Sequence, residues 1–299
     1  MTQTVMLALS GCLANLTATD KAFTAPPCLF EQSLPYSKAS FNMFSTLDSQ
    51  PQEWLKNDAN AQHTLCVCVF RNSASAKKWI HHLVPKNQND KFLKWSSGGR
   101  EARNRMRRLE FLNNIEQEYD AIDFTVHCIS STEGQISQLT QAFYLQNLSN
   151  ITQETDNKGR NCLVFKTGDT TSLRVPVLRA AKLLWIFYCL KYMKDVHKLD
   201  GFILSDWFSC DSTTGENAAM GVKTVNFLLQ SSGIDLQLSI PHDPSRDEGE
   251  LLSDWFSGLC NSSKNGTIDE ELTVRFKALT DRKPTKIDAI DYICNFTIV

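Results

Sequence analysis

The alternation of short apolar runs with longer amphipathic segments is the feature that most constrains the fold of this chain. Strands are predicted at 64–70, 124–129, 162–166, 201–205 and 234–240. Helices are predicted at 74–83, 100–119, 133–148, 176–193, 216–230, 247–259 and 270–279. Because parallel strands are joined through crossovers of about a dozen residues or more, the alternation predicts an α/β fold. We expect a mixed, largely parallel sheet with helices on both faces.

The N-terminal part of the chain lacks this alternation. An apolar run at 4–9 predicts a short strand, and Pro26 and Pro27 then argue against a regular element. We expect residues 1–60 to form an irregular segment that contributes an edge strand, and residues 61–299 to form the α/β domain. No low-complexity linker divides the chain, so one domain that includes all residues is the alternative.

Charge and hydropathy narrow the possible partners. The chain has 31 basic and 33 acidic side chains, so a nucleic acid would have to be held by a local patch. The apolar run Leu183–Leu190 is much shorter than the roughly 20 residues of a membrane-spanning helix. The ten cysteines show no CxxC spacing, which is typical of reduced thiols in a core. These features predict a cytoplasmic protein without a membrane partner and leave its oligomeric state open.

Strong local signatures of catalytic sites are absent from the sequence. It contains no P-loop, no glycine-rich dinucleotide-binding turn, no HExxH and no zinc-type Cys/His spacing. His127 lies inside the expected strand 124–129, where we interpret it as a satisfied core residue rather than a metal ligand. Candidate chemistry therefore depends on the acidic and basic side chains.

Two acidic residues follow the expected strand 201–205. Asp206 comes directly after the strand, and Asp211 lies in the loop before the next helix. In an open α/β sheet, ligands bind beyond the carboxyl ends of the strands. We therefore expect Asp206 to project into a site there, with capping of the turn after the strand as its alternative role.

Further acids lie along one edge of the apolar face of the expected helix 247–259. Glu250 and Asp254 belong to this acidic stripe. Carboxylates at a sheet rim and on a facing helix suit Mg²⁺, which prefers oxygen ligands. We predict Asp206 and Asp254 as metal ligands, with Glu250 or Asp211 completing a catalytic site. Stabilisation of the positive helix end is the alternative explanation for acids in the first turn.

Basic residues gather near the start of the second expected helix. Arg100, Arg103 and Arg107 share one face of it, and Lys94 and Trp95 lie just upstream. Guanidinium groups bind phosphate oxygens, and an indole ring stacks on nucleic-acid bases. This arrangement predicts a nucleic-acid-binding surface. The alternatives are a solvated helix face balanced by Glu101 and Glu110 and, for Trp95, a role in packing.

Three segments resemble the RNase H-like superfamily and, within it, a family of bacterial and phage proteins. They are Phe92–Trp95, the strand Phe202–Asp206 and the helix segment Leu251–Gly258. The resemblance implies an RNase H-like sheet and Mg²⁺-dependent cleavage of phosphodiester bonds in nucleic acid. It also implies a place in a bacterial antiviral defence or mobile-element system.

The chain departs from the family pattern at its first strand. The expected strand 4–9 continues into Ser10 and Gly11, where the resemblance implies an aspartate that bridges two metal ions. Either another acid, such as Asp20 or Glu31, takes that role, or catalysis has been lost. The first case predicts a Mg²⁺-dependent nuclease. The second predicts a non-catalytic subunit that binds a protein or a nucleic acid.

Overall fold

The structure is a computed structural model that describes most of the chain between residues 44 and 291. The described ranges are 44–50, 58–95, 101–147, 150–166, 172–204, 215–239 and 250–291. The helices in these ranges are α2 (Ser73–Leu83), α3 (Glu101–Glu118), α4 (Glu133–Gln146), α5 (Val177–His197), α7 (Gly215–Ser231), α8 (Glu250–Lys264) and α9 (Glu270–Thr280). The strands are β1 (Phe44–Gln50), β2 (Gln62–Phe70), β3 (Thr125–Thr132), β4 (Ile151–Thr155), β5 (Asn161–Lys166), β6 (Ser172–Pro176), β7 (Gly201–Leu204), β8 (Leu236–Ser239) and β9 (Ile287–Asp291).

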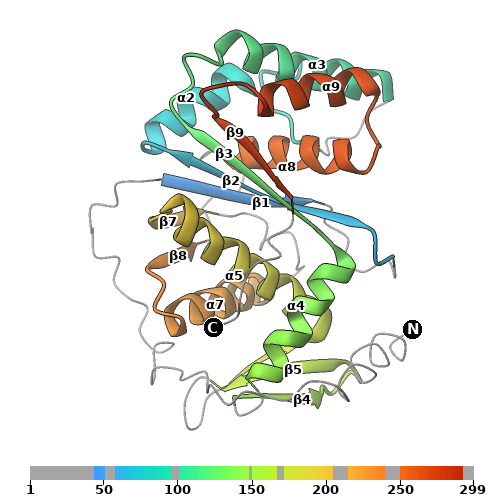
Figure 1. Cartoon of the computed structure of the whole chain (residues 1–299), viewed down its shortest axis with the longest axis vertical. Helices are drawn as coiled ribbons and strands as arrows, with labels where there is room; N and C mark the ends of the chain where they lie inside the picture. Colours follow the sequence, from blue (N-terminus) through green and yellow to red (C-terminus); the bar gives the residue numbers. More distant parts are fainter. Residues whose placement is uncertain are drawn as a thin grey trace.

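Six strands form the larger sheet, in the order β8-β7-β1-β2-β3-β9. β2 pairs antiparallel with β1 and with β3, whereas the pairs β7–β1, β8–β7 and β3–β9 are parallel. β2 therefore runs against the other five strands. A smaller antiparallel sheet has the order β4-β5-β6 (Figure 1). A mixed α/β fold with a partly parallel sheet is thus confirmed.

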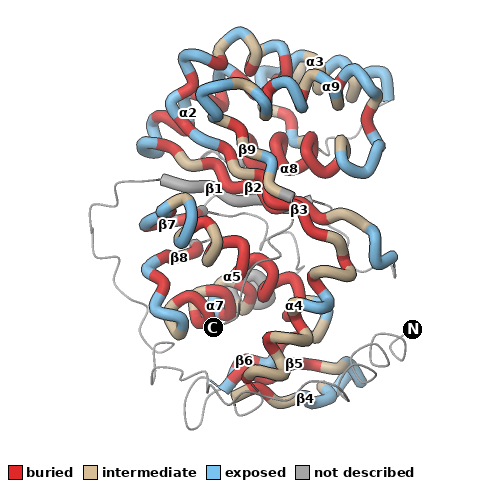
Figure 2. Tube along the Cα trace, viewed as in Figure 1, coloured by how far each residue is buried: buried red, intermediate tan, exposed pale blue. Residues whose placement is uncertain are grey.

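Helices cover both faces of the larger sheet, as predicted. α2, α3, α8 and α9 lie on one side, and α4, α5 and α7 lie on the other (Figure 1). Side chains of β2 alternate between the two resulting cores. Leu65 and Val67 join the core that contains α5, whereas Cys66 and Cys68 join the core that contains α8. Both cores are largely inaccessible to solvent (Figure 2).

The N-terminal segment contributes a strand to the larger sheet. The strand expected at 4–9 lies outside the described residues, so an edge strand there stays a prediction. β1 forms at Phe44–Gln50 and lies between β7 and β2. Its sequence is largely polar, so its apolar pattern is weak. Pairing on both sides supplies backbone hydrogen bonds that a polar strand can use as well as an apolar one.

Helix α5 forms much of the core on its side of the sheet. The apolar run Leu183–Leu190, which lies within it, is buried throughout. The helix ends at His197 because Lys198 adopts a left-handed conformation with φ of 57°, a common way to stop a helix. Among the described residues, no helix combines the length and the hydropathy that crossing a membrane requires.

Candidate functional site

The acids predicted to follow the strand at 201–205 come directly after β7 in the chain. This strand ends at Leu204, so Asp206 and Asp211 lie outside the described residues. Leu204 is the last β7 residue in parallel register with β1, opposite Thr46. Two residues beyond Thr46 on β1 stands Asp48, just as Asp206 stands two residues beyond Leu204 in the chain. β1 thus carries an acid beside the strand that leads to the predicted site.

Asp48 was missed by the sequence analysis. Its register partner on β2 is Cys66, which belongs to the core that contains α8. The apolar run at 4–9 is the stronger strand signal in the N-terminal segment, because apolar runs are the usual sign of a strand. The sequence signal for Asp48 is weak. It consists only of the position of this acid in a short segment, after Thr46 and Leu47, that precedes the long apolar strand at 64–70.

Helix α8 carries the second predicted metal ligand. It packs against β1, β2 and β3 and begins at Glu250, the other predicted acid of this helix. Asp254 is 9% exposed, and its Oδ2 accepts a hydrogen bond from the backbone N–H of Trp95 at 2.7 Å. Such a charge-assisted hydrogen bond contributes roughly 1.5–3 kcal/mol. The carboxylate is therefore held in one orientation by the 93–95 segment.

The indole of Trp95 packs tightly on α8. A Cβ atom at Gly258 would lie 2.3 Å from Cγ of the indole, so only glycine allows the ring to approach this closely. The indole therefore occupies the space that a side chain at this position of α8 would need. The guanidinium of Arg108 lies over the same ring, with Cζ 4.4 Å from its centroid. Trp95 is thus a packing residue rather than a stacking platform for bases.

The predicted phosphate-binding residues on α3 differ in exposure. Arg103 is exposed and Arg107 is half-buried, one helical turn apart, and Lys94 is exposed near the start of this region. Arg100 lies outside the described residues. Their neighbour Arg105 forms ion pairs with Asp269 and Glu271 at the start of α9. Ion pairing with α9 therefore uses part of the basic run, whereas the alternative interpretation expected a solvated face balanced by acids of the same helix.

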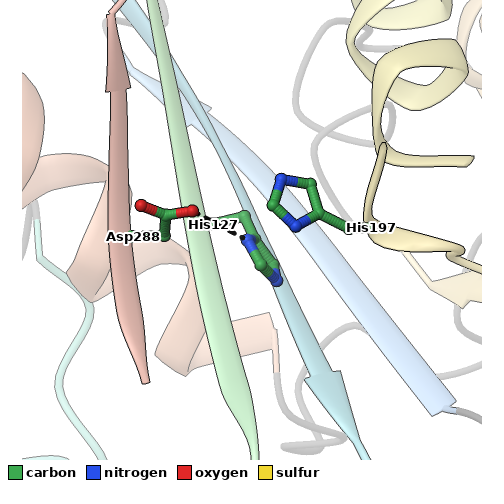
Figure 3. A group of neighbouring side chains, drawn as sticks. All are labelled: His127, His197 and Asp288. Atoms are coloured by element: carbon green, nitrogen blue, oxygen red, sulfur yellow. Dashed lines mark ion pairs between the residues drawn. The ribbon is translucent and has the colours of Figure 1, made fainter. Parts of the chain in front are cut away.

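A second group of polar side chains lies on the opposite face of the sheet. His127 on β3 and Asp288 on β9 are register partners in the parallel pair, and His197 is the last residue of α5. One ligand-type atom from each residue lies within 4.8 Å of those from the other two. Figure 3 shows the three side chains converging between the two strands and the end of the helix.

Each of the two histidines of this group has one buried ring nitrogen without a hydrogen-bond partner among the described residues. These atoms are Nδ1 of His127 and Nε2 of His197. Asp288 Oδ2 lies 3.8 Å from Nδ1 of His127, which is beyond hydrogen-bonding distance. The imidazole ring centroids are 4.2 Å apart. Interpretation of His127 as a satisfied core residue therefore does not match the structure, which leaves one of its nitrogens without a partner.

Both imidazoles of this group favour the neutral form. Burial, together with repulsion from His197, lowers the pKa of His127 to about 4, although Asp288 opposes the shift. Burial also lowers the pKa of His197 from its usual value, again against the attraction of Asp288. A neutral imidazole has a free lone pair, which is the form that binds metal ions.

The sequence offered no local signal for this group. His127 and Asp288 are separated by 161 positions, and no metal-binding motif spans them. The strand that carries Asp288 was not predicted, because Ile287–Asp291 is only five residues long and two of them are acidic. Comparison of the sequence with models of known protein families and with curated proteins gives no match. Functional inference therefore depends on the arrangement of residues in this fold.

Proposed function

We propose that this protein is a Mg²⁺-dependent phosphodiesterase that acts on nucleic acid and has an RNase H-like sheet. The observation that carries the proposal is the strand order. β1, β2 and β3 are antiparallel neighbours, and β7 and then β8 are added in parallel beside β1. This order is typical of the RNase H-like superfamily, and β9 is an addition at the far edge.

The same order supports a site made of three acids. Asp48 is on β1, Asp206 follows the parallel neighbour β7, and Asp254 is on α8, which packs against β1. Asp48 thereby supplies the first-strand acid that the run at 4–9 lacks. Glu250 and Asp211 are further candidates for completing the site.

Carboxylate oxygens are the ligands that Mg²⁺ prefers, so this donor set suits a hard divalent cation. A pair of such ions stabilises the attacking and the leaving oxygens during phosphodiester cleavage. The protein's own contribution is to hold the carboxylates in place. The hydrogen bond from Trp95 to Asp254 is the type of outer contact that orients a metal-binding carboxylate.

Substrate binding is assigned to the basic residues near α3. Arg103 and Arg107 would contact backbone phosphates, together with Lys94 and Arg100. Contacts of this kind depend on charge rather than on base sequence. Because the chain as a whole carries a formal charge of −2, binding would depend strongly on this local patch and on the salt concentration.

One observation favours a second candidate function, that of a non-catalytic interaction subunit of a defence or mobile-element complex. Asp254 is only 9% exposed, and it fixes the 93–95 segment on α8. Trp255 adds a second link, because its indole N–H donates to the backbone oxygen of Leu93 at 2.6 Å. An acid with this packing role is explained without a metal ion, and the protein would then bind a nucleic-acid or protein partner on the same scaffold.

A cleavage assay separates these two functions. The full chain is incubated with labelled single-stranded and double-stranded DNA and RNA, in Mg²⁺, Mn²⁺ or EDTA. We expect cleavage that requires the metal and falls at least about hundredfold in Asp206→Asn. Asp195→Asn is the matched control, because Asp195 pairs with Lys191 on the exposed surface of α5. Absence of cleavage from every substrate would favour the interaction subunit.

A further inference from the structure

Three elements that are distant in the chain converge at His127, His197 and Asp288. β3 and β9 are paired so that His127 and Asp288 stand side by side, and the end of α5 brings His197 to them. Nδ1 of His127 and Oδ2 of Asp288 are 3.8 Å apart. Ligands at about 2.1 Å from a tetrahedral zinc ion lie about 3.4 Å from one another. Side-chain adjustments of about an ångström would therefore bring all three groups to zinc-binding distance.

Two buried ring nitrogens of this group have unused capacity to bind a hydrogen-bond donor or a metal ion. Nδ1 of His127 and Nε2 of His197 form no hydrogen bond in the described part of the molecule. Nearly all buried polar atoms in folded proteins have a partner, so two exceptions whose rings are 4.2 Å apart require an explanation. A metal ion would accept a lone pair from each ring.

The exposure of the group suits an ion that keeps contact with solvent. The side chain of His127 is 12% exposed and that of Asp288 is 41% exposed. Three protein ligands and a water molecule in the fourth position are the usual ligand set of an open zinc site.

From this geometry we propose that His127, His197 and Asp288 bind one Zn²⁺ ion, at a site separate from the Mg²⁺ site of the proposed function. Two imidazoles and one carboxylate suit transition metals such as zinc, whereas Mg²⁺ prefers oxygen ligands alone. The acidic site involves β1, β7 and α8, while this one joins β3 and β9 to the end of α5. The bound ion fastens α5 to the edge of the sheet that ends in β9.

Metal titration of the full chain tests this proposal. The protein is stripped with EDTA, dialysed and titrated with Zn²⁺ against a chromophoric chelator. We expect one tight site per chain, with affinity reduced about hundredfold or more in His197→Ala and in Asp288→Asn. His82→Ala is the control, because His82 is an exposed histidine on α2 and should bind zinc as wild type does. Circular dichroism confirms that each variant is folded. Equal zinc affinity in wild type, His197→Ala and Asp288→Asn would overturn the assignment.

Cobalt substitution identifies the ligand atoms. Buried thiols such as Cys66 and Cys128, with Sγ atoms 3.7 Å apart, are the competing ligands elsewhere in the described residues. A Co²⁺ complex of this site should show tetrahedral d–d absorption without a thiolate charge-transfer band, and His197→Ala should remove it. A thiolate band would contradict the proposal. Mg²⁺-dependent cleavage should persist in His197→Ala, so the zinc site and the nuclease can fail independently.

Discussion

The two faces of the larger sheet carry two different kinds of candidate cation site. On the side of α8, Asp254 offers only oxygen atoms, and the backbone N–H of Trp95 already orients its carboxylate. On the side of α5, His127 and His197 offer nitrogen atoms for which the described part of the chain supplies no hydrogen-bond partner. Because the ligand atoms differ, the two sites should select different ions: Mg²⁺ on one face and a transition metal on the other.

The two sites also differ in how the fold holds them before an ion arrives. Asp254 is 9% exposed and belongs to a helix that is packed against three strands. His127 and Asp288 lie side by side through strand register, but Nδ1 of His127 and Oδ2 of Asp288 remain 3.8 Å apart. One site is thus fixed by protein contacts, whereas the other would be completed by the ion itself.

The largest expected effect is on cleavage, and it distinguishes the predicted Mg²⁺ site from the proposed zinc site. Asp48→Asn should lower Mg²⁺-dependent cleavage at least about hundredfold, because it removes the first-strand carboxylate from the ion-binding set. Zinc affinity should remain that of the wild type, as measured by chelator competition. Wild-type cleavage by Asp48→Asn, together with loss in Asp206→Asn, would show that the first acid lies elsewhere.

The second expected effect concerns acid stability of the metal-free protein. The pKa of His127 is lowered to about 4 in the fold, so between pH of about 6.5 and 4 the unfolded chain binds a proton that the folded chain does not. The free energy of unfolding should therefore fall as the pH is lowered through this range, by on the order of 3 kcal/mol from this residue. Urea unfolding in EDTA at several pH values measures it.

The matched variants for this titration are His127→Asn and His82→Asn. The first should flatten the pH dependence between 6.5 and 4, since the residue with the lowered pKa is gone. The second should leave the curve unchanged, because His82 is exposed on α2. An equal slope in wild type and His127→Asn would show that other groups, such as the buried His63, whose pKa is lowered by burial, cause the acid sensitivity.

A smaller effect on stability tests how tightly Trp95 packs against α8. Gly258→Ala places a Cβ atom where the Trp95 ring packs, and it should destabilise the fold by about 1–3 kcal/mol through overpacking. Ser262→Ala, near the end of the same helix, is the control. Trp95→Ala should remove most of the penalty of Gly258→Ala in a double-mutant cycle of urea unfolding. Additive penalties would show that the cost of Gly258→Ala does not come from contact with the indole.

The smallest expected effect concerns substrate binding. Arg103→Ala and Arg107→Ala should each reduce the slope of log affinity against log salt concentration by about one, with similar losses for all nucleic-acid sequences. Arg282→Ala is the control, because Arg282 lies after α9, outside the predicted phosphate-binding surface, and forms an ion pair with Asp120. Fluorescence anisotropy across a salt series gives the slopes. Unchanged slopes in both α3 variants would remove these residues from the phosphate-binding surface.

The strongly periodic elements were predictable from the sequence. The helix expected at 100–119 corresponds to α3, and the strand expected at 64–70 corresponds to most of β2. α3 buries apolar residues at helical spacing, and β2 is a nearly continuous apolar run that is buried between two cores, so packing and pattern agree. β1 was not predicted, because its short and largely polar sequence carries no clear apolar pattern.

The contacts of the candidate sites were not predictable in the same way. Asp254 was placed on a helix by its spacing, but its hydrogen bond to Trp95 joins residues 159 positions apart. The pairing of His127 with Asp288 follows from the register of β3 and β9, which no local pattern encodes. Asp206, Asp211 and Arg100 lie outside the described residues, so their roles stay predictions.

The position of Asp288 on β9 has a consequence for how the protein is made. During synthesis, His127 and His197 leave the ribosome well before Asp288 does, and β9 joins the sheet only after that. Zinc delivered to the nascent chain would meet two histidines without their carboxylate. Zinc can therefore bind to all three ligands only after β9 has paired with β3. Zinc binding at this site would then indicate that β9 has joined the sheet.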